Sequence, residues 1–180
     1  DLLTQIEPAP DNVGFWVAVG AEALQAVIAD LELQLTGAPR EASMREALET
    51  AGCAIVVPDF ETGCEVCNRI APEHLSLAVK EPEKALERIA NAGCILVGEW
   101  TPESAGDYVL GPSHTLPTAG AARWQAPVSV AEFLKLQTVV QATPEDMREL
   151  GPAIEALASL EGFPAHANGA TVRLDAIRDR

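Results

Sequence analysis

The segment AGCAIVVPDFETGCEVCNRIAPEHLSLAVKEPEKALERIANAGCILV, residues 51–97, alternates short apolar runs with helical patterns. Apolar runs of strand length lie at residues 54–57, 75–79 and 94–97. Between them, residues 60–70 and 82–92 carry apolar side chains at helical spacing. Short strands that alternate with helices predict a parallel sheet with right-handed crossovers. Because these runs lack polar alternation, we expect the strands to be buried on both faces.

The same alternation extends upstream, whereas the downstream residues follow a different pattern. Residues 13–18 form another apolar run, and helical patterns follow at 21–35 and 41–51. Residues 99–127 are rich in Gly, Pro, Ser and Thr, which is typical of loops. Beyond them we expect two or three helices, one of them over residues 144–160.

This layout predicts an α/β fold with a partial Rossmann-like parallel sheet, flanked by helices, and a C-terminal helical tail. We expect an incomplete Rossmann-like α/β domain over residues 1–118 and the helical tail over residues 119–180.

The charge balance argues against two classes of partner. The 27 acidic residues outnumber the 12 basic ones, so the formal net charge is -15. Such a surface repels phosphate backbones and anionic lipids, and we expect no nucleic acid and no membrane as partner. No apolar run reaches the ~18 to 20 residues that span a bilayer. The start at Asp1 lacks the features of a secretory signal. We expect the chain to be part of a longer one.

The four cysteines do not resemble a disulfide framework. Cys64 and Cys67 form a C-x-x-C pair, a spacing compatible with a redox pair or with two zinc ligands. The pair lies inside a helical pattern, and no second pair follows at zinc-finger spacing. We therefore expect packing cysteines in a reducing cytoplasm.

The three histidines, His74, His114 and His166, each stand in a polar, turn-rich setting. Glu73 and His74 are adjacent groups of different pKa, suited to moving protons near neutral pH. Asp107 and His114 lie in one loop among glycines and prolines, although an N-capping Asp in a surface loop is the alternative interpretation. Carboxylate, amide and imidazole ligands together suit zinc. These patterns alone indicate an α/β domain with a polar site.

Neither of the common phosphate-binding glycine patterns occurs in the chain. No G-x-G-x-x-G turn follows a strand, and there is no G-x-x-x-x-G-K-[ST] loop. We therefore expect any nucleotide site to lie elsewhere.

Several short blocks, taken in order, resemble histidinol dehydrogenase over nearly all 180 residues. They are Asp1-Leu2-Leu3-Thr4-Gln5, Asn68-Arg69-Ile70-Ala71-Pro72-Glu73-His74, Thr101-Pro102-Glu103, Gly106-Asp107-Tyr108, the block from Gly111 to Thr118 and Ala165-His166. All three histidines fall on functional positions of that family.

The resemblance implies a role for each candidate residue. It makes Glu73 and His74 the acid–base pair. The implied zinc ligands are Gln5, Asp107 and His166, and the implied substrate contacts are His114, Glu161, Asp107 and His166. It also implies a homodimer, formed in part by the helical tail, in which His166 reaches the partner's site.

The implied reaction is the NAD-dependent oxidation of L-histidinol to L-histidine through the aldehyde, a step of histidine biosynthesis in the cytoplasm. In that scheme His74 takes the alcohol proton and Glu73 activates water for the second step. His114 holds developing oxygen charge, and Zn2+ orients the substrate. The residues that bind NAD are expected upstream of residue 1, so the chain alone is expected to be inactive.

One position departs from the family pattern. The resemblance implies a zinc-ligating histidine three residues after Gln5, but this chain has Pro8, which offers no side-chain donor. Two alternatives therefore stay open. One is a non-catalytic, degenerate homologue that serves as a binding or dimerisation module, and the other is a relative that oxidises a different alcohol.

Overall fold

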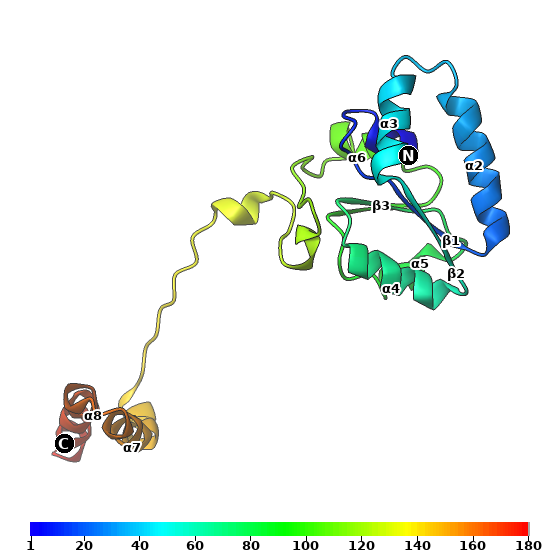
Figure 1. Cartoon of the computed structure of the whole chain (residues 1–180). Coiled ribbons are helices and arrows are strands. Elements are labelled where there is room, and N and C mark those ends of the chain that lie inside the picture. The colour runs from blue at the N-terminus through cyan, green and yellow to red at the C-terminus, as the bar shows by residue number, and fades with distance from the viewer. Residues whose placement is uncertain (180) are drawn as a thin grey trace. The chain divides into compact units, whose positions relative to one another are not determined.

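The computed structural model describes residues 1–179, which divide into two compact units (Figure 1). The first unit is Asp1–Leu134, and the second begins at Lys135. The division falls later than the boundary expected after residue 118, because residues 119–134 pack with the first unit. This segment contains the 3-10 helices η1 (Ala121–Arg123) and η2 (Val130–Phe133).

Two pairs of parallel strands form the sheets of the first unit. Strand β1 (Phe15–Val19) pairs with β2 (Cys53–Val57). Strand β3 (His74–Leu77) pairs with β4 (Cys94–Val97), with His74 opposite Cys94. The predicted α/β fold, with parallel strands flanked by helices and a helical C-terminal part, is confirmed.

Helices connect the strands. Helices α2 (Ala21–Leu35) and α3 (Glu41–Ala51) lie between β1 and β2, and α4 (Phe60–Ile70) leads to β3, all three with the predicted bounds. Helix α5 (Pro82–Leu86) ends earlier than the predicted residue 92. The side chain of Asn68 accepts hydrogen bonds from the backbone N–H groups of residues 90 and 91, which are therefore not part of a helix.

Two apolar clusters hold these elements together. Ile6 of α1 (Leu2–Ile6) packs with Leu35, Met44 and Ala47, which fixes α1 against α2 and α3. The second cluster joins α4, β3 and α5 through Cys64, Leu77 and Ala85. Burial raises the pKa of the Cys64 thiol, as expected of a packing cysteine. All four cysteines are free.

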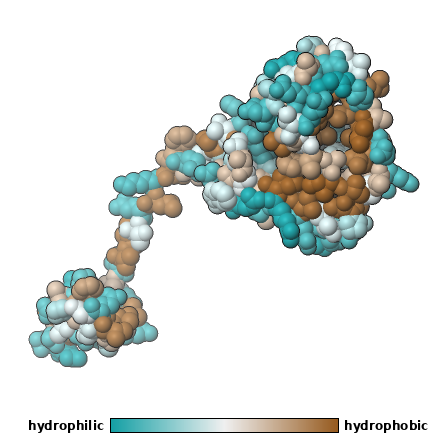
Figure 2. All heavy atoms as spheres, in the orientation of Figure 1, coloured by the Kyte–Doolittle hydropathy of each residue, from teal (hydrophilic) through white to brown (hydrophobic). Residues whose placement is uncertain are grey.

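The predicted burial of the strands on both faces is wrong for the first pair. Phe15, Val19 and Val56 are exposed, although α2 and α4 pack against β1. Helices α2 and α4 make the main contacts with this pair of strands, and they leave these side chains uncovered. Apolar residues accordingly show on the surface of this unit in Figure 2. No helix within residues 1–179 is long and apolar enough to cross a membrane.

The second unit contains two packed helices, α7 (Pro144–Leu160) and α8 (Pro164–Arg178). Thr143 and Asp146 form a capping box at the start of α7. The helices approach closely at Gly151, where an added Cβ would meet Leu174 side-chain atoms at 2.9 Å. Gly162, at a φ of +74°, forms the turn between them.

Candidate active site

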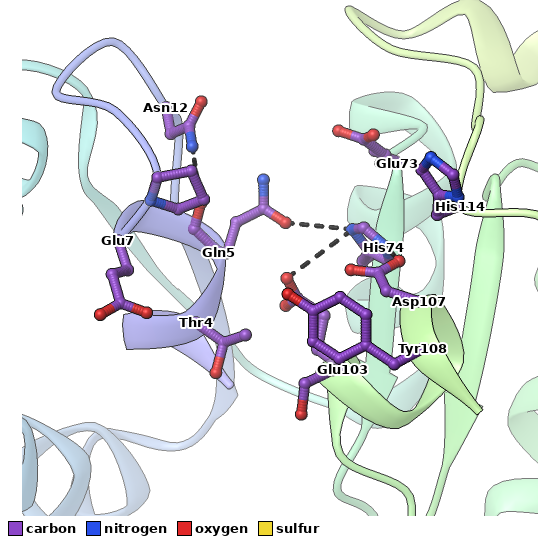
Figure 3. Close-up of a pocket in the computed structure, with 12 residues that line it drawn as sticks. Thr4, Gln5, Glu7, Asn12, Glu73, His74, Glu103, Asp107, Tyr108 and His114 are labelled. Atoms are coloured by element: carbon purple, nitrogen blue, oxygen red, sulfur yellow. Dashed lines mark hydrogen bonds and ion pairs between the residues drawn. The ribbon is translucent and has the colours of Figure 1, made fainter. Parts of the chain in front are cut away.

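His74 lies at the centre of a polar cluster in the first unit (Figure 3). It is the first residue of β3, and its side chain is only 10% exposed. Its Nδ1 atom is 3.1 Å from Oε1 of Gln5 on α1. Its Nε2 atom is 3.2 Å from Oδ1 of Asp107 on α6 (Glu103–Tyr108). Three elements that are distant in sequence thus meet at one imidazole ring.

The N-terminal segment is tied to the other two elements by hydrogen bonds. The carboxylate of Asp1 accepts from the Ser76 hydroxyl on β3 at 3.0 Å and from the backbone N–H of Glu103 at 3.3 Å. The side chain of Asn12 donates to the backbone oxygen of Gln5 at 3.0 Å. Together with the buried Ile6, these bonds place the Gln5 side chain opposite His74.

A cavity of about 520 Å³ opens beside this cluster. It brings together five of the predicted site residues: Gln5, Glu73, His74, Asp107 and His114. Gly93 has a part in this arrangement, because an added Cβ there would meet the backbone oxygen of Glu73 at 2.6 Å and Pro117 at 3.1 Å. Without a side chain at Gly93, the loop that carries His114 can lie close to Glu73.

Glu161 and His166, the other predicted site residues, belong to the second unit. Glu161 follows the last residue of α7, and His166 lies in the first turn of α8. Both are exposed, and the His166 ring lies 5.2 Å from that of Phe163. Their roles as substrate contacts stay predictions, as does the role of His166 as a zinc ligand.

Glu103 is a further member of the cluster that the sequence did not indicate as a site residue. It is 6% exposed and is the one buried charged residue in the described chain. Its Oε1 atom lies 3.8 Å from Nδ1 of His74. Burial raises the pKa of its carboxyl, and the nearby His74 opposes that shift. A Pro followed by an acidic residue is a helix-start signal and was available at Pro102-Glu103.

The residues of the first unit do not complete a zinc site. Gln5 and Asp107 offer oxygen donors, but both are paired with His74. Pro8 lines the same cavity and has no donor atom. Among residues 1–179, no three His, Cys, Asp or Glu side chains gather as a metal centre would require. A structural or catalytic zinc ion needs three or four protein ligands.

Comparison with known proteins identifies the family. Residues 1–174 match the histidinol dehydrogenase family. The chain belongs to the histidinol dehydrogenase family. Its members are oxidoreductases, and the blocks around Gln5, His74, Asp107 and His114 lie within the matched residues.

Individual relatives agree with this assignment. Histidinol dehydrogenase of Methylococcus capsulatus is 41% identical over 174 residues, which are 97% of this chain and 40% of that protein. The Yersinia pestis enzyme is 38% identical over 179 residues, 99% of this chain and 40% of that protein. The crystal structure of histidinol dehydrogenase from Elizabethkingia anophelis superposes with a TM-score of 0.93 at 36% identity, covering 98% of this chain and 41% of that one. The chain thus spans about 40% of the length of these histidinol dehydrogenases.

Proposed function

We propose that this chain forms the acid–base part of an enzyme that oxidises L-histidinol to L-histidine with two NAD molecules in succession. The observation that carries the proposal is the convergence of Glu73, His74 and Asp107 on one cavity in a member of the histidinol dehydrogenase family. A similar protein of Photorhabdus laumondii, 38% identical over 177 residues, is described as a putative histidine biosynthesis bifunctional protein. It supports a place in that pathway, and we propose the cytoplasm as its location.

His74 acts in the first oxidation. His74 takes the hydroxyl proton of the alcohol and becomes an imidazolium. NAD, held chiefly by residues upstream of Asp1, would accept the hydride from the alcohol carbon, which leaves the aldehyde. The negative charges of Asp107 and Glu103 lie beside that ring and offer a counterion to the imidazolium as it forms. Its neighbours hold the His74 ring in place and largely shield it from water. A base with a fixed orientation is suited to remove the proton of one substrate hydroxyl.

Glu73 acts in the second oxidation. It removes a proton from a water molecule that adds to the aldehyde carbon, giving a hydrate. A second NAD would accept the hydride from the hydrate carbon, and His74, again neutral, would take a hydroxyl proton of the hydrate, so that the product is the carboxylic acid. His114, which lines the same cavity, donates a hydrogen bond to the substrate oxygen as charge develops on it.

The remaining contacts belong to the same proposal. Glu161 and His166 bind the substrate, with His166 supplied by the partner subunit of a homodimer. Gln5, Asp107 and His166 would hold Zn2+, but Pro8 contributes no donor, and we expect weaker zinc binding than in relatives with a fourth ligand. NAD would be bound chiefly by residues upstream of Asp1.

Pro8 favours a second candidate function, a non-catalytic module that dimerises or binds a ligand. The test is NADH formation from L-histidinol by the protein that includes the upstream part, with zinc supplied. The proposed enzyme forms two NADH per histidinol. A folded, dimeric protein that forms none supports the non-catalytic module, and turnover only with another alcohol supports a different dehydrogenase.

A further inference from the structure

The side chain of Asp1 bonds to two elements other than its own helix. Asp1 is the N-cap residue of α1, a position at which an aspartate usually accepts a hydrogen bond from the first turn of that helix. Within Leu2–Ile6, no backbone N–H donates to the Asp1 side chain. Its carboxylate accepts instead from the Ser76 hydroxyl on β3 and from the backbone N–H of Glu103 on α6. These two hydrogen bonds, here called the Asp1 bridge, join three elements.

Helix α6 needs an acceptor from outside at its start. Its N-cap residue, Pro102, has no side-chain acceptor, so the free N–H groups of the first turn must be satisfied by other groups. Glu103 is buried, and an unpaired N–H in a buried position costs free energy. The Asp1 carboxylate supplies the acceptor at 3.3 Å. Asp1 thus caps α6 in place of Pro102.

In both helices, a residue of the His74 cluster lies one turn beyond the Asp1 bridge. Gln5 follows Asp1 by four residues, and its backbone N–H donates to the Asp1 carbonyl oxygen at 3.0 Å. Asp107 follows Glu103 by four residues, so both lie on the same face of α6. A shift at the start of either helix would therefore move the Gln5 or the Asp107 side chain with it.

Ser76, the strand residue of the bridge, stands in the same relation to His74. It is two residues beyond His74 on β3, and alternate residues of a strand point to the same face. Two strand residues span about 7 Å, and one helical turn rises about 5.4 Å. The Asp1 bridge thus forms a second layer of polar contacts, one structural repeat away from the layer in which Gln5 and Asp107 meet the His74 ring (Figure 3).

We propose that Asp1 is a positioning residue, which sets how Gln5 and Asp107 meet the His74 ring by fixing the starts of their helices on β3. The meaning for catalysis rests on the proposed function, whereas the contact can be measured without turnover. A misplacement of about 1 Å, caused far from the reacting atoms, can slow an enzyme about 100-fold. The apolar packing of Ile6 still anchors α1, so loss of the bridge shifts the site without unfolding it.

The first experiment measures hydrogen exchange of the Glu103 backbone amide in the chain by NMR. Asp1→Ala removes the acceptor, and we expect this amide to exchange at least about tenfold faster. Asp1→Asn keeps an oxygen acceptor for the amide, and its NH2 group can donate to the Ser76 hydroxyl, so the protection should remain. The matched control is Asp59→Ala, because the exposed Asp59 caps its own helix, α4, and should not affect the Glu103 amide.

The second experiment measures kcat in the protein with its upstream part, with L-histidinol and NAD saturating. We expect Asp1→Ala to lower kcat about tenfold and Asp1→Asn to restore it to within about threefold of the unmodified value. Ser76→Ala removes one of the two bonds and should lower kcat about threefold. Asp59→Ala should lower the thermal stability and leave kcat unchanged, which is also what Asp1→Ala would do if Asp1 served stability alone.

Unchanged exchange of the Glu103 amide in Asp1→Ala would overturn the proposal. Unchanged kcat in a folded Asp1→Ala protein would do the same, as would Asp1→Asn that is as slow as Asp1→Ala. If Asp1→Ala does not fold, Ser76→Ala decides, and an unchanged kcat in that variant contradicts the role of the bridge. Inactivity of the unmodified protein would defeat the proposed function, while amide exchange still judges the contact.

Discussion

In the first unit, His74 is held between three elements and is only 10% exposed, whereas in the second unit Glu161 and His166 lie exposed at the turn between two helices. The hydrogen bonds of Gln5 and Asp107 fix the His74 ring before any ligand arrives. The only ring contact recorded for His166 within residues 1–179 is with Phe163. The first region thus has the ordered polar cluster that the proposed chemistry requires, whereas the second region leaves its two proposed contact residues accessible.

The apolar residues of the second unit support the same distinction. Leu160 is 85% exposed, and Leu157 and Phe163 are exposed with it. The buried residues of its two helices are few and mostly small: Gly151, Ala158, Ala170 and Leu174. So small a core gives limited stability, and exposed leucines in such a unit suit an interface. This is the physical support for the proposed homodimer.

Substitution of Glu73 is the strongest test of this difference between the two units. If the first unit performs the chemistry, Glu73→Gln should slow the second oxidation about 10²- to 10⁴-fold, since the aldehyde hydrate no longer forms with a general base. The measurement is NADH formed per histidinol, which should fall from two towards one as the aldehyde accumulates. Glu65→Gln, at an exposed position on α4, is the control and should retain two.

Glycine substitutions compare the packing of the two regions. Gly93→Ala should destabilise the first unit by about 1 to 3 kcal/mol or more, because the new methyl group meets backbone at Glu73. Gly169→Ala in α8 has open space and should stabilise the second unit by roughly 0.5 to 1 kcal/mol. All three tryptophans lie in the first unit, so their fluorescence reports Gly93→Ala but not Gly169→Ala. Equal effects at both positions would contradict the packing described here.

Glu161→Gln tests whether the second unit contributes binding rather than chemistry. Loss of one charged hydrogen bond to the substrate is expected to raise KM about tenfold or more, with kcat nearly unchanged. Steady-state kinetics of the protein with its upstream part measure this split. A large fall in kcat with constant KM would show that Glu161 acts in the chemical step. It would contradict the proposed division into a chemical first unit and a binding second unit.

The smallest expected effect is a change in how the stability of the second unit depends on pH. Hydrogen bonds from Thr143 hold the pKa of Asp146 below its ordinary 3.8. The stabilisation is therefore present above that pH and is lost as the pH falls through the lower folded-state value. Asp146→Asn keeps an acceptor but cannot titrate, so melting of α7 and α8, followed by circular dichroism below pH 3.8, should depend less on pH. An unchanged dependence would exclude this contribution.

The elements that the sequence predicted well are those with strong local signals. Helices α2, α3, α4 and α7 have the predicted bounds, because each combines helical spacing of apolar residues with a clear stop or cap. Five of the predicted site residues line one cavity, and they occur along the chain in the order of the family blocks. The resemblance to a family, rather than the spacing of residues, supplied that order.

The features that the sequence did not predict depend on tertiary contacts. Helix α6 has six residues, too few for a periodic pattern, so Glu103 was placed in a loop. Exposure of the β1–β2 faces depends on how completely helices cover this pair of strands, which an apolar run does not reveal. The extent of the first unit likewise depends on where residues 119–134 pack.

The most direct test of the central claim is the rate of the first hydride transfer in His74→Asn, measured in the protein that includes the upstream part with L-histidinol and NAD saturating. Loss of the base should slow NADH formation at least about 100-fold while the protein stays folded. A rate within twofold of the unmodified protein would show that the cavity around His74 is not where the alcohol is oxidised.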